Sequence, residues 1–432
     1  MKVCIFEDSS VSSLAPLNHL RHTTELICGA LSLKDKFQYT LGEKFPLSFH
    51  CRKYLAAHMK ESFPRSEVNN FSPDDHLFLN SRVIFTKFFI DGLQFTLQDF
   101  ENTVLIKDKT IIAFYITQNK IAAFRKRLES KRENNLITIN DLAGMKFKLF
   151  QVDELNTDET DELKIINLPS DLVLYHESEM KKDLDFLLKK NQTSKRRINN
   201  AELINRSKIF IGQNSSISSQ VVIDASNGPV FIGDRTVIEP FSFIHGPVYI
   251  GEDSTVRSGS KLYGPVRVGD QCKISGEIIS SVLHSYVNKQ HLGFLGHSYL
   301  CEWVNLGAGT TTSNLKNNYS EITIKLGRRE LPTGSIFLGS LIGDHTKASI
   351  NTSLNTGTFI GISCNLYGSG FHSKSVRSFS WGDASGKTVT YDIEKALKTA
   401  RTSMKRRSVN MSKTYEDLMR YHFKNIKTNR SF

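Results

Sequence analysis

Aliphatic residues recur at every sixth position through much of the C-terminal half of the chain. Eight follow one another without interruption: Ile232, Ile238, Ile244, Ile250, Val256, Leu262, Val268 and Ile274. A period of six matches neither an α-helix nor an ordinary strand, whereas it is typical of a hexapeptide β-solenoid whose aliphatic side chains point into a prism. An ordinary β-rich domain would reach this register only by chance. The pattern therefore predicts a left-handed parallel β-helix from about residue 209 to about residue 370.

The same register extends in both directions. Upstream it includes Ile211, Ile217 and Ile223. Downstream it includes Val282, Phe294, Leu300 and Leu306, and the polar Asn288 occupies one position of this series. The last group is Ile336, Ile342, Ala348, Leu354, Ile360 and Leu366. We expect these aliphatic and aromatic residues in the core. The repeat loosens between residues 278 and 300 and again between residues 311 and 335, and these irregular stretches hold most of the reactive side chains.

The N-terminal half alternates between strand and helix patterns. Short apolar runs predict strands at Val3–Phe6, His76–Leu79 and Ile111–Ile116, and helical spacing predicts helices at Thr24–Phe37 and Ala122–Lys131. We therefore expect an α/β domain over residues 1–175. A helical linker over 176–205 should lead into the β-helix over 206–375. A basic tail over 376–432 should form one α-helix from Asp392 to about Arg407 and begin a second near Thr414.

Composition narrows the class of protein. The net charge is +12, but its basic clusters have no interleaved aromatic residues, which favours a solvated helix face over nucleic-acid binding. The six cysteines have no paired spacing, so we expect buried thiols rather than zinc sites or disulfides. The N-terminus turns acidic too early for a signal peptide, and no apolar run approaches a membrane span. These features predict a cytoplasmic protein without a membrane span.

One histidine stands out within the irregular stretches. His291 precedes glycine-rich turns, and imidazole titrates near neutral pH, so this side chain suits a general base. The cations Arg257, Lys261, Arg267 and Lys289 could hold an anionic substrate and keep His291 neutral. His345, in a Gly-Asp-His setting, is a rival base.

Two carboxylates, Glu7 and Asp8, directly follow the first predicted strand. Carboxylate oxygens are ligands that Mg²⁺ prefers. Asp8 is therefore a candidate metal ligand, although the same residues could simply cap the next turn.

The run from Lys289 to Asn314 resembles a known enzyme family. His291, Leu295-Gly296, Val304-Asn305, Gly307-Ala308-Gly309-Thr310 and Asn314 are similar to the acetyltransferase half of the bifunctional N-acetylglucosamine-1-phosphate uridyltransferase / glucosamine-1-phosphate N-acetyltransferase. Phe337-Leu338-Gly339-Ser340 resembles a later segment of that family.

This resemblance implies a set of roles. His291 would be the general base, Asn305 and Asn314 would contact the amino sugar, and Gly307, Ala308 and Ser340 would bind acetyl-CoA. The acceptor would be an amino-sugar phosphate or a nucleotide-sugar, as in the amino-sugar metabolism that makes cell-wall precursors. Three chains would form a homotrimer with shared active sites.

A second resemblance covers nearly the whole chain. The strings 293–296, 305–310, 313–319, 343–347, 351–352, 355–358 and 379–382 are similar to a bacterial family of sugar nucleotidyltransferases that carries the same β-helix. The N-terminal hallmark of this family is partly kept in Leu14-Ala15-Pro16-Leu17, Arg21, Glu25-Leu26 and Gly29, whereas His22 and Ile27 depart from it. The resemblance implies a degenerate nucleotidyltransferase-like N-terminal domain.

Several departures keep alternatives open. Ile279 replaces a lysine of the acetyltransferase's phosphate clamp, and Phe294 and Leu315 replace tyrosines. The N-terminal half lacks the glycine-rich loop that would bind nucleotide phosphates through backbone N–H groups. Three functions therefore remain open. The first is an acyltransferase, the second is a sugar-1-phosphate nucleotidyltransferase whose activity resides in the N-terminal domain, and the third is a non-catalytic trimeric β-helix scaffold.

Overall fold

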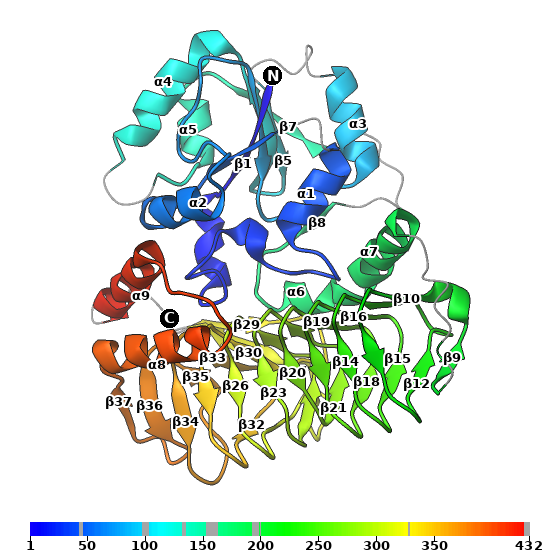
Figure 1. Cartoon of the computed structure of the whole chain (residues 1–432). Helices are drawn as coiled ribbons and strands as arrows, with labels where there is room; N and C mark the ends of the chain where they lie inside the picture. The colour runs from blue at the N-terminus through cyan, green and yellow to red at the C-terminus, as the bar shows by residue number, and fades with distance from the viewer. Residues whose placement is uncertain are drawn as a thin grey trace. The chain divides into compact units, whose positions relative to one another are not determined.

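The computed structural model describes residues 1–42, 46–96, 103–131, 135–152, 163–191, 198, 200–326 and 329–426. The chain forms two compact units (Figure 1). The first unit contains residues 1–14, 20–26 and 32–167, and the second contains residues 15–19, 27–31 and 168–432. Two short N-terminal segments thus belong to the second unit.

The first unit is built on a mixed six-stranded sheet. Its strands lie in the order β2 (Leu47–His50), β1 (Lys2–Phe6), β3 (His76–Asn80), β6 (Thr110–Ile116), β5 (Thr103–Lys107) and β7 (Lys148–Gln151). The pairs β1–β2, β1–β3 and β5–β7 are parallel, whereas β6 runs antiparallel to both of its neighbours. The strands predicted at Val3–Phe6, His76–Leu79 and Ile111–Ile116 are therefore confirmed.

Helices and a small second sheet accompany these strands. They are α1 (Leu33–Leu41), α2 (Ala56–Ser62), α3 (Lys87–Thr96), α4 (Gln118–Glu129), α5 (Ile139–Ala143) and the antiparallel pair β4 (Val83–Ile84) and β8 (Lys164–Ile165). The predicted helix over Thr24–Phe37 is wrong in its bounds, because α1 begins only at Leu33. The Ser32 side chain caps α1 there by accepting a hydrogen bond from the Asp35 N–H. Stacked and edge-on rings of Phe6, Phe78, Phe114 and Phe124 form much of the core.

The second unit is a parallel β-helix, as the six-residue period predicts. One sheet contains β10 (Ile209–Ile211), β13 (Val230–Ile232), β16 (Val248–Ile250), β19 (Val266–Val268), β22 (Val282–Leu283), β25 (Tyr299–Leu300), β30 (Ser340–Ile342), β33 (Thr358–Ile360) and β35 (Ser375–Val376). The next contains β11 (Ser216–Ile217), β14 (Val237–Ile238), β17 (Thr255–Val256), β20 (Lys273–Ile274), β23 (Asn288–Lys289), β26 (Asn305–Leu306), β31 (Lys347–Ala348), β34 (Asn365–Tyr367), β36 (Ser380–Asp383) and the antiparallel β37 (Thr388–Thr390).

The third face of the prism contains β9 (Glu202–Ile204), β12 (Val222–Asp224), β15 (Phe243–His245), β18 (Lys261–Tyr263), β21 (Glu277–Ile279) and β24 (Phe294–Gly296), with a separate pair, β27 (Thr311–Thr312) and β32 (Ser353–Leu354), further along the chain. Between β27 and β30 the chain adds an insertion that contains the antiparallel hairpin β28 (Thr323–Leu326) and β29 (Arg329–Pro332).

The predicted core register is confirmed through the first coils. Every aliphatic residue from Ile232 to Ile274 in the eightfold run is fully buried and pairs with its counterpart one coil away. Burying such a side chain stabilises the fold by roughly 1.5–3 kcal/mol. Burial of one aliphatic side chain on each side of every coil therefore accounts for the regular stacking of the coils.

The predicted register is wrong by one residue in part of the irregular stretch between residues 278 and 300. Val268 pairs with Leu283 rather than Val282, Ile274 pairs with Lys289 rather than Asn288, and Ile278 pairs with Leu295 rather than Phe294. The cause is that the inward-facing residues Ile274, Ile278 and Leu283 are separated by steps of four and five residues, after which the six-residue step resumes. A five-residue step from Leu295 to Leu300 restores the predicted phase. The prediction that Ile336 lies in the core is also wrong, since this residue is 42% exposed.

Two helices and the N-terminal segments cover parts of the prism. Helix α7 (His176–Lys190), which follows the short α6 (Asp171–Leu174), packs Met180 and Leu184 against Phe231. The Ile27 N–H donates to the Tyr299 hydroxyl at 2.8 Å, and Arg267 Nε donates to the Ala30 carbonyl at 3.0 Å. These contacts anchor residues 27–31 on the outer side of β19 and β25.

The C-terminal tail forms the two helices that the sequence predicts. They are α8 (Ile393–Lys405) and α9 (Lys413–Ile426). The Asp392 side chain caps helix α8 by accepting a hydrogen bond from the Lys395 N–H, and the helix buries Leu397 and Ala400. The two helices are joined by ion pairs such as Arg420 with Glu394.

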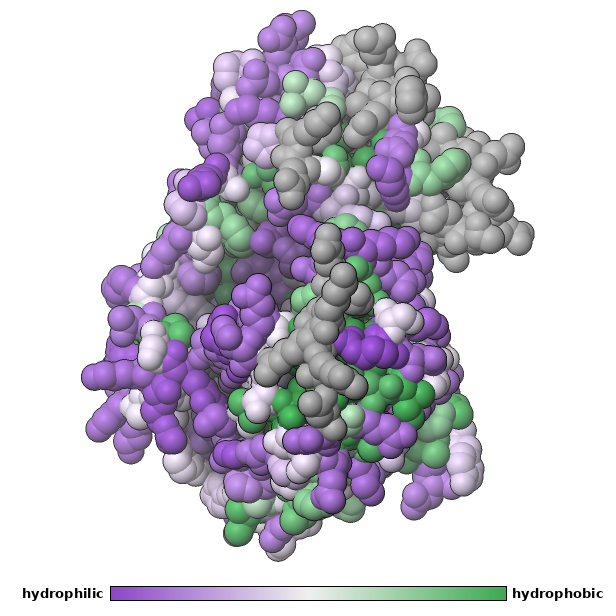
Figure 2. All heavy atoms as spheres, turned by 45° about the vertical axis from the view of Figure 1, so that its right-hand side comes forward, coloured by the Kyte–Doolittle hydropathy of each residue, from purple (hydrophilic) through white to green (hydrophobic). Residues whose placement is uncertain are grey.

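The surface is mixed in character. In the view that brings the first coils forward, hydrophobic residues gather in the lower part of the molecule among hydrophilic ones (Figure 2). Ala201, Leu203 and Ile217 of the first coils are only partly buried against the core. All six cysteines are free and buried, as expected. No helix among the described residues combines the length and the apolar character needed to cross a bilayer.

Candidate functional site

The corner between β23 and β24 holds His291. The Leu292 carbonyl oxygen accepts a hydrogen bond from the Gly309 N–H at 3.0 Å, so the His291 loop lies directly on the glycine-rich turn of the next coil. Gly293 makes this approach possible. Its φ is +130°, and a Cβ at this position would lie 2.1 Å from the Thr310 carbonyl oxygen.

The His291 side chain is exposed at this corner. It makes no hydrogen bond or ion pair with the described residues. Its neighbour Leu292 is 72% exposed. A substrate atom can therefore reach the imidazole, as a general base requires.

Lys289 lies inside the prism rather than on its surface. The side chain occupies the core position between Ile274 and the next coil and is only 1% exposed. Its Nζ donates to the carbonyl oxygens of Ser275 at 2.9 Å and His291 at 3.1 Å. Burial lowers the pKa of Lys289 to about 8. Lys289 therefore holds the loop that carries His291, in a position from which it does not reach a substrate on the surface.

The Gly307-Ala308-Gly309 turn faces the same corner. The Gly307 N–H donates to Ala348 and the Gly309 N–H to Leu292, so neither is available to a ligand. The Ala308 N–H has no acceptor among the described residues, and Ala308 itself is partly exposed. The Ala308 N–H is therefore a donor of this turn that the described residues leave available to a ligand.

The two asparagines of the predicted site are engaged by neighbours. Asn305 accepts from Asn288 Nδ2 at 2.6 Å on the outer side of β23 and β26. Asn314 donates through Nδ2 to His297 Nδ1 at 2.8 Å, and the His297 ring stacks on Phe337 with centroids 5.0 Å apart. Burial lowers the pKa of His297 to about 4. Asn314 and its partners lie at the opposite end of β24 from His291.

The remaining predicted residues lie elsewhere on the prism. Arg257 pairs with Glu239 at 2.7 Å, and Lys261 is exposed on β18, in register with Glu277 of the next coil. Both precede the His291 coil. Ser340 is fully buried, and its N–H donates to the Ser298 hydroxyl. The structure therefore brings together His291, Lys289, Gly307 and Ala308 but not Arg257, Lys261 or Ser340.

His345 has structural surroundings. It is 4% exposed, its Nε2 lies 3.0 Å from the Tyr415 hydroxyl of α9, and its ring is parallel to that of Trp303 at 6.0 Å. Trp303 in turn stacks on Tyr286 at 4.0 Å. This ladder of rings on successive coils holds α9 on the β-helix.

Sequence reasoning missed His297 and Phe337 as partners. One signal was present, because His297 stands six residues after His291 and so occupies the equivalent position at the next corner. The contact with Phe337 spans forty residues of the chain, and no local pattern predicts it.

In the first unit, Asp8 does not offer Mg²⁺ a ligand set. Its two oxygens accept from Arg82 Nε at 2.9 Å and Nη2 at 2.6 Å, and Asn80 donates to one of them as well. Glu7 forms a similar buried pair with Arg52. No group of three or more metal-binding side chains occurs in the part of the chain that the structure describes.

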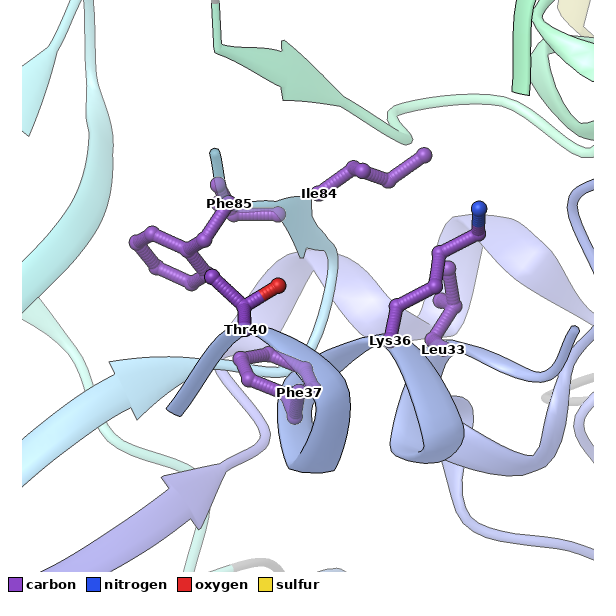
Figure 3. A pocket seen from close by; sticks show the side chains of 7 residues that line it. Leu33, Lys36, Phe37, Thr40, Ile84 and Phe85 are labelled. Carbon is purple, nitrogen blue, oxygen red and sulfur yellow. The ribbon is translucent and has the colours of Figure 1, made fainter. Parts of the chain in front are cut away.

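A small apolar depression also lies in the first unit. Figure 3 shows side chains of α1, among them Phe37 and Thr40, beside Ile84 and Phe85. The rings of Phe37 and Phe85 lie 5.5 Å apart. Side chains fill this space and no room for a ligand remains, so the depression is part of the core packing rather than a candidate site.

Two segments of the chain match transferase family models. Residues 3–192 match the family model described as sugar nucleotidyl transferase, and residues 229–264 match that of the bacterial transferase hexapeptide with six repeats. A bifunctional sugar-1-phosphate nucleotidylyltransferase/acetyltransferase of Sulfurisphaera tokodaii is 32% identical over 93 residues. That alignment covers 22% of this chain and only 23% of the relative.

Two solved acyltransferase structures resemble the chain weakly. UDP-N-acetylglucosamine acyltransferase from Francisella novicida is 15% identical, with a TM-score of 0.26, over 49% of this chain and 71% of that one. The enzyme of the same name from Bacteroides fragilis is 13% identical, with a TM-score of 0.26, over 52% and 96%. Likeness at this level does not identify a function. The two family models nevertheless show that a region matching the sugar nucleotidyl transferase model precedes a run of bacterial-transferase hexapeptide repeats in this chain.

Proposed function

We propose that the β-helix unit is an acyltransferase that moves an acetyl group from acetyl-CoA to the amine of an amino-sugar phosphate or a nucleotide-sugar. The observation that carries this proposal is the hydrogen bond between the backbones of Leu292 and Gly309, which holds the loop that carries the exposed His291 on the Gly-Ala-Gly turn. A proton acceptor and a free backbone donor therefore lie on adjacent loops of one rigid corner.

In this proposal His291 takes the proton of the attacking amine. The amine nitrogen forms an amide bond with the acetyl carbonyl carbon, the carbon–sulfur bond breaks, and the proton held by His291 passes to the departing sulfur to give the thiol of coenzyme A. The Ala308 N–H stabilises the oxygen on which negative charge develops, as oxyanion-hole donors do. Lys289 acts as a positioning residue, because its ammonium group holds the His291 carbonyl. By resemblance we also propose a homotrimer as the active assembly, which light scattering of the purified protein tests.

The test is release of coenzyme A from acetyl-CoA in the presence of a panel of amino-sugar phosphates and nucleotide amino-sugars. A His291→Ala variant should lose about 10²- to 10⁴-fold in rate with the acceptor that the wild type uses. His245→Ala is a matched control, because His245 is a partly exposed histidine three coils away, on β15. Equal loss in both variants, or an intact rate in His291→Ala, contradicts the proposal.

A second candidate function belongs to the first unit. The match of residues 3–192 to sugar nucleotidyl transferases favours transfer of a nucleotidyl group to a sugar 1-phosphate. Release of pyrophosphate from nucleoside triphosphates with Mg²⁺ and sugar 1-phosphates tests this activity. Because Glu7 and Asp8 are both committed to buried arginines, their surroundings do not support a metal site at these residues.

A further inference from the structure

Three aromatic side chains gather around Gly296 at the end of β24. His297 stacks on Phe337 with an angle of 17° between the rings. A Cβ at Gly296 would lie 2.6 Å from both Asn314 Nδ2 and Phe294 Cζ. The absence of a side chain at this position therefore lets Asn314 and the Phe294 ring lie beside His297.

The hydrogen bond from Asn314 sets the state of the His297 ring. Because the Asn314 amide donates to Nδ1, the ring proton is on Nε2, which makes that atom a donor. Nε2 has no acceptor among the described residues and reaches solvent. Burial keeps the pKa of His297 near 4, so the ring stays neutral at physiological pH.

The aromatic platform beside this donor is held in place. Phe337 is 37% exposed, so part of its ring remains open after stacking on His297. The backbones of Leu315 and Phe337 form an antiparallel bridge, and the Leu338 N–H donates to the Asn314 carbonyl at 3.0 Å. Both ends of the insertion are therefore fixed against each other at this corner.

We propose that His297, Phe337, Phe294 and Asn314 form a subsite for the nucleobase of a substrate. A planar heteroaromatic ring stacks on the aromatic side chains, and His297 Nε2–H donates to a carbonyl oxygen or ring nitrogen of the base. Stacking suits any base because each has a π face, while an in-plane donor selects a ring with acceptors at its edge. An acyl chain would gain nothing from that donor.

The distance from the reacting corner suits this assignment. His297 follows His291 by six positions, which places the subsite at most about 22 Å from the proposed base. This inference rests on the proposed acyl transfer. The base then belongs either to a nucleotide-sugar acceptor or to the adenine of acyl-CoA, and both join a nucleobase to the reacting group through phosphates.

Calorimetric titration of the full-length protein with UDP and, separately, with adenosine 3′,5′-bisphosphate tests the subsite. Phe337→Leu removes the ring and keeps apolar bulk, so it should weaken binding about 5- to 150-fold. His297→Phe keeps a stacked ring and loses the donor, so it should weaken binding about 2- to 13-fold. Phe241→Leu is the control, because Phe241 is 65% exposed near β15, three coils away, and should leave binding unchanged.

The outcomes separate the possibilities. Loss of UDP binding in both variants supports the subsite and assigns it to the acceptor, whereas loss of bisphosphate binding supports it and assigns it to the donor. Binding that neither variant changes, as for a nucleotide held by the first unit, overturns the inference, and so does the absence of binding to either probe. Variant-sensitive binding without acetyl transfer would retain the subsite and reject the proposed function.

Discussion

The ammonium group of Lys289, inside the prism, donates a hydrogen bond to the carbonyl oxygen of His291 at 3.1 Å. A core position of a hexapeptide repeat is thus occupied by a cation whose partners are backbone carbonyls. The core of the β-helix and the exposed corner are coupled at this one residue.

Replacing Lys289 with methionine should therefore separate stability from activity. The variant should lose at least about tenfold in acetyl transfer, because the His291 loop loses its anchor. Burial of the charged form costs about 3 kcal/mol below pH 8, from a shift of the pKa from 10.5 to about 8. Lys289→Met avoids this cost and so gains stability. The two lost hydrogen bonds, of roughly 1 kcal/mol each, offset most of that gain, so the variant should be no less stable than the wild type at pH 7.

The pH dependence of this difference has a definite sign. Because the folded-state pKa of Lys289 lies below the unfolded value, the unfolded chain binds more protons between pH 8 and pH 10.5. The wild type should gain stability relative to Lys289→Met as the pH rises through that window. Urea denaturation of both proteins at pH 7, 9 and 10 measures the difference, and a difference that does not change with pH contradicts the buried charge.

Gly293→Ala should damage the same corner by steric conflict. The new Cβ would meet the Thr310 carbonyl oxygen at 2.1 Å. We expect a loss of at least about 2 kcal/mol in stability together with reduced transfer. Gly259→Ala is the matched control, since Gly259 also has a positive φ, +74°, but open space around it. Thermal denaturation of the two variants compares them, and similar melting temperatures would rule out the steric explanation.

His345→Ala should affect stability rather than catalysis. The change removes the contact with Tyr415 and the stack on Trp303, so α9 should detach more readily from the β-helix. We expect a lower melting temperature and faster proteolysis of the C-terminal tail, with a rate per folded molecule within about threefold of the wild type. A rate as low as that of His291→Ala would instead restore His345 as the base.

Glu7→Gln should destabilise the first unit at neutral pH by about 3–5 kcal/mol, because Arg52 would be left as an unpaired buried charge. Burial alone would raise the pKa of Glu7, but Arg52, His22 and the hydrogen bonds from Arg52 hold it at about 2. The wild type should therefore keep this stabilisation above pH 4.5 and lose it as the pH falls toward 2.

Glu67→Gln is a suitable comparison for this change. Glu67 pairs with Lys2 at a partly exposed site and should contribute no more than about 1 kcal/mol. Denaturant titrations at pH 7 and at several pH values between 4.5 and 2 provide both measurements. Equal losses in the two variants would mean that burial of the Glu7 pair has no energetic consequence.

Much of the β-helix was predictable from the sequence, because each coil repeats one elementary requirement. A residue such as Ile250 must be aliphatic since it stacks between Ile232 and Val268 in a dry core. The prediction failed where a prism side contains fewer than six residues. Val282 and Phe294 are as apolar as Leu283 and Leu295, so composition alone could not place the one-residue shift.

The candidate site was less predictable for a related reason. His291 and the Gly307–Thr310 turn were found because they are local strings, whereas the inward direction of Lys289 follows from the shifted register. Contacts such as His297 with Phe337 depend on how the insertion returns to the prism. Likewise, the engagement of Asp8 by Arg82 joins residues seventy-four positions apart.

The second unit is not encoded by one continuous stretch of the sequence. Residues 15–19 and 27–31 leave the first unit and belong to the second, where Ile27 and Ala30 make hydrogen bonds with Tyr299 and Arg267. A gene fragment beginning near residue 168 would encode a β-helix without these segments. Such a fragment would leave the Tyr299 hydroxyl without its Ile27 donor and Arg267 Nε without its Ala30 acceptor, so it should be less stable than the same unit in the full chain.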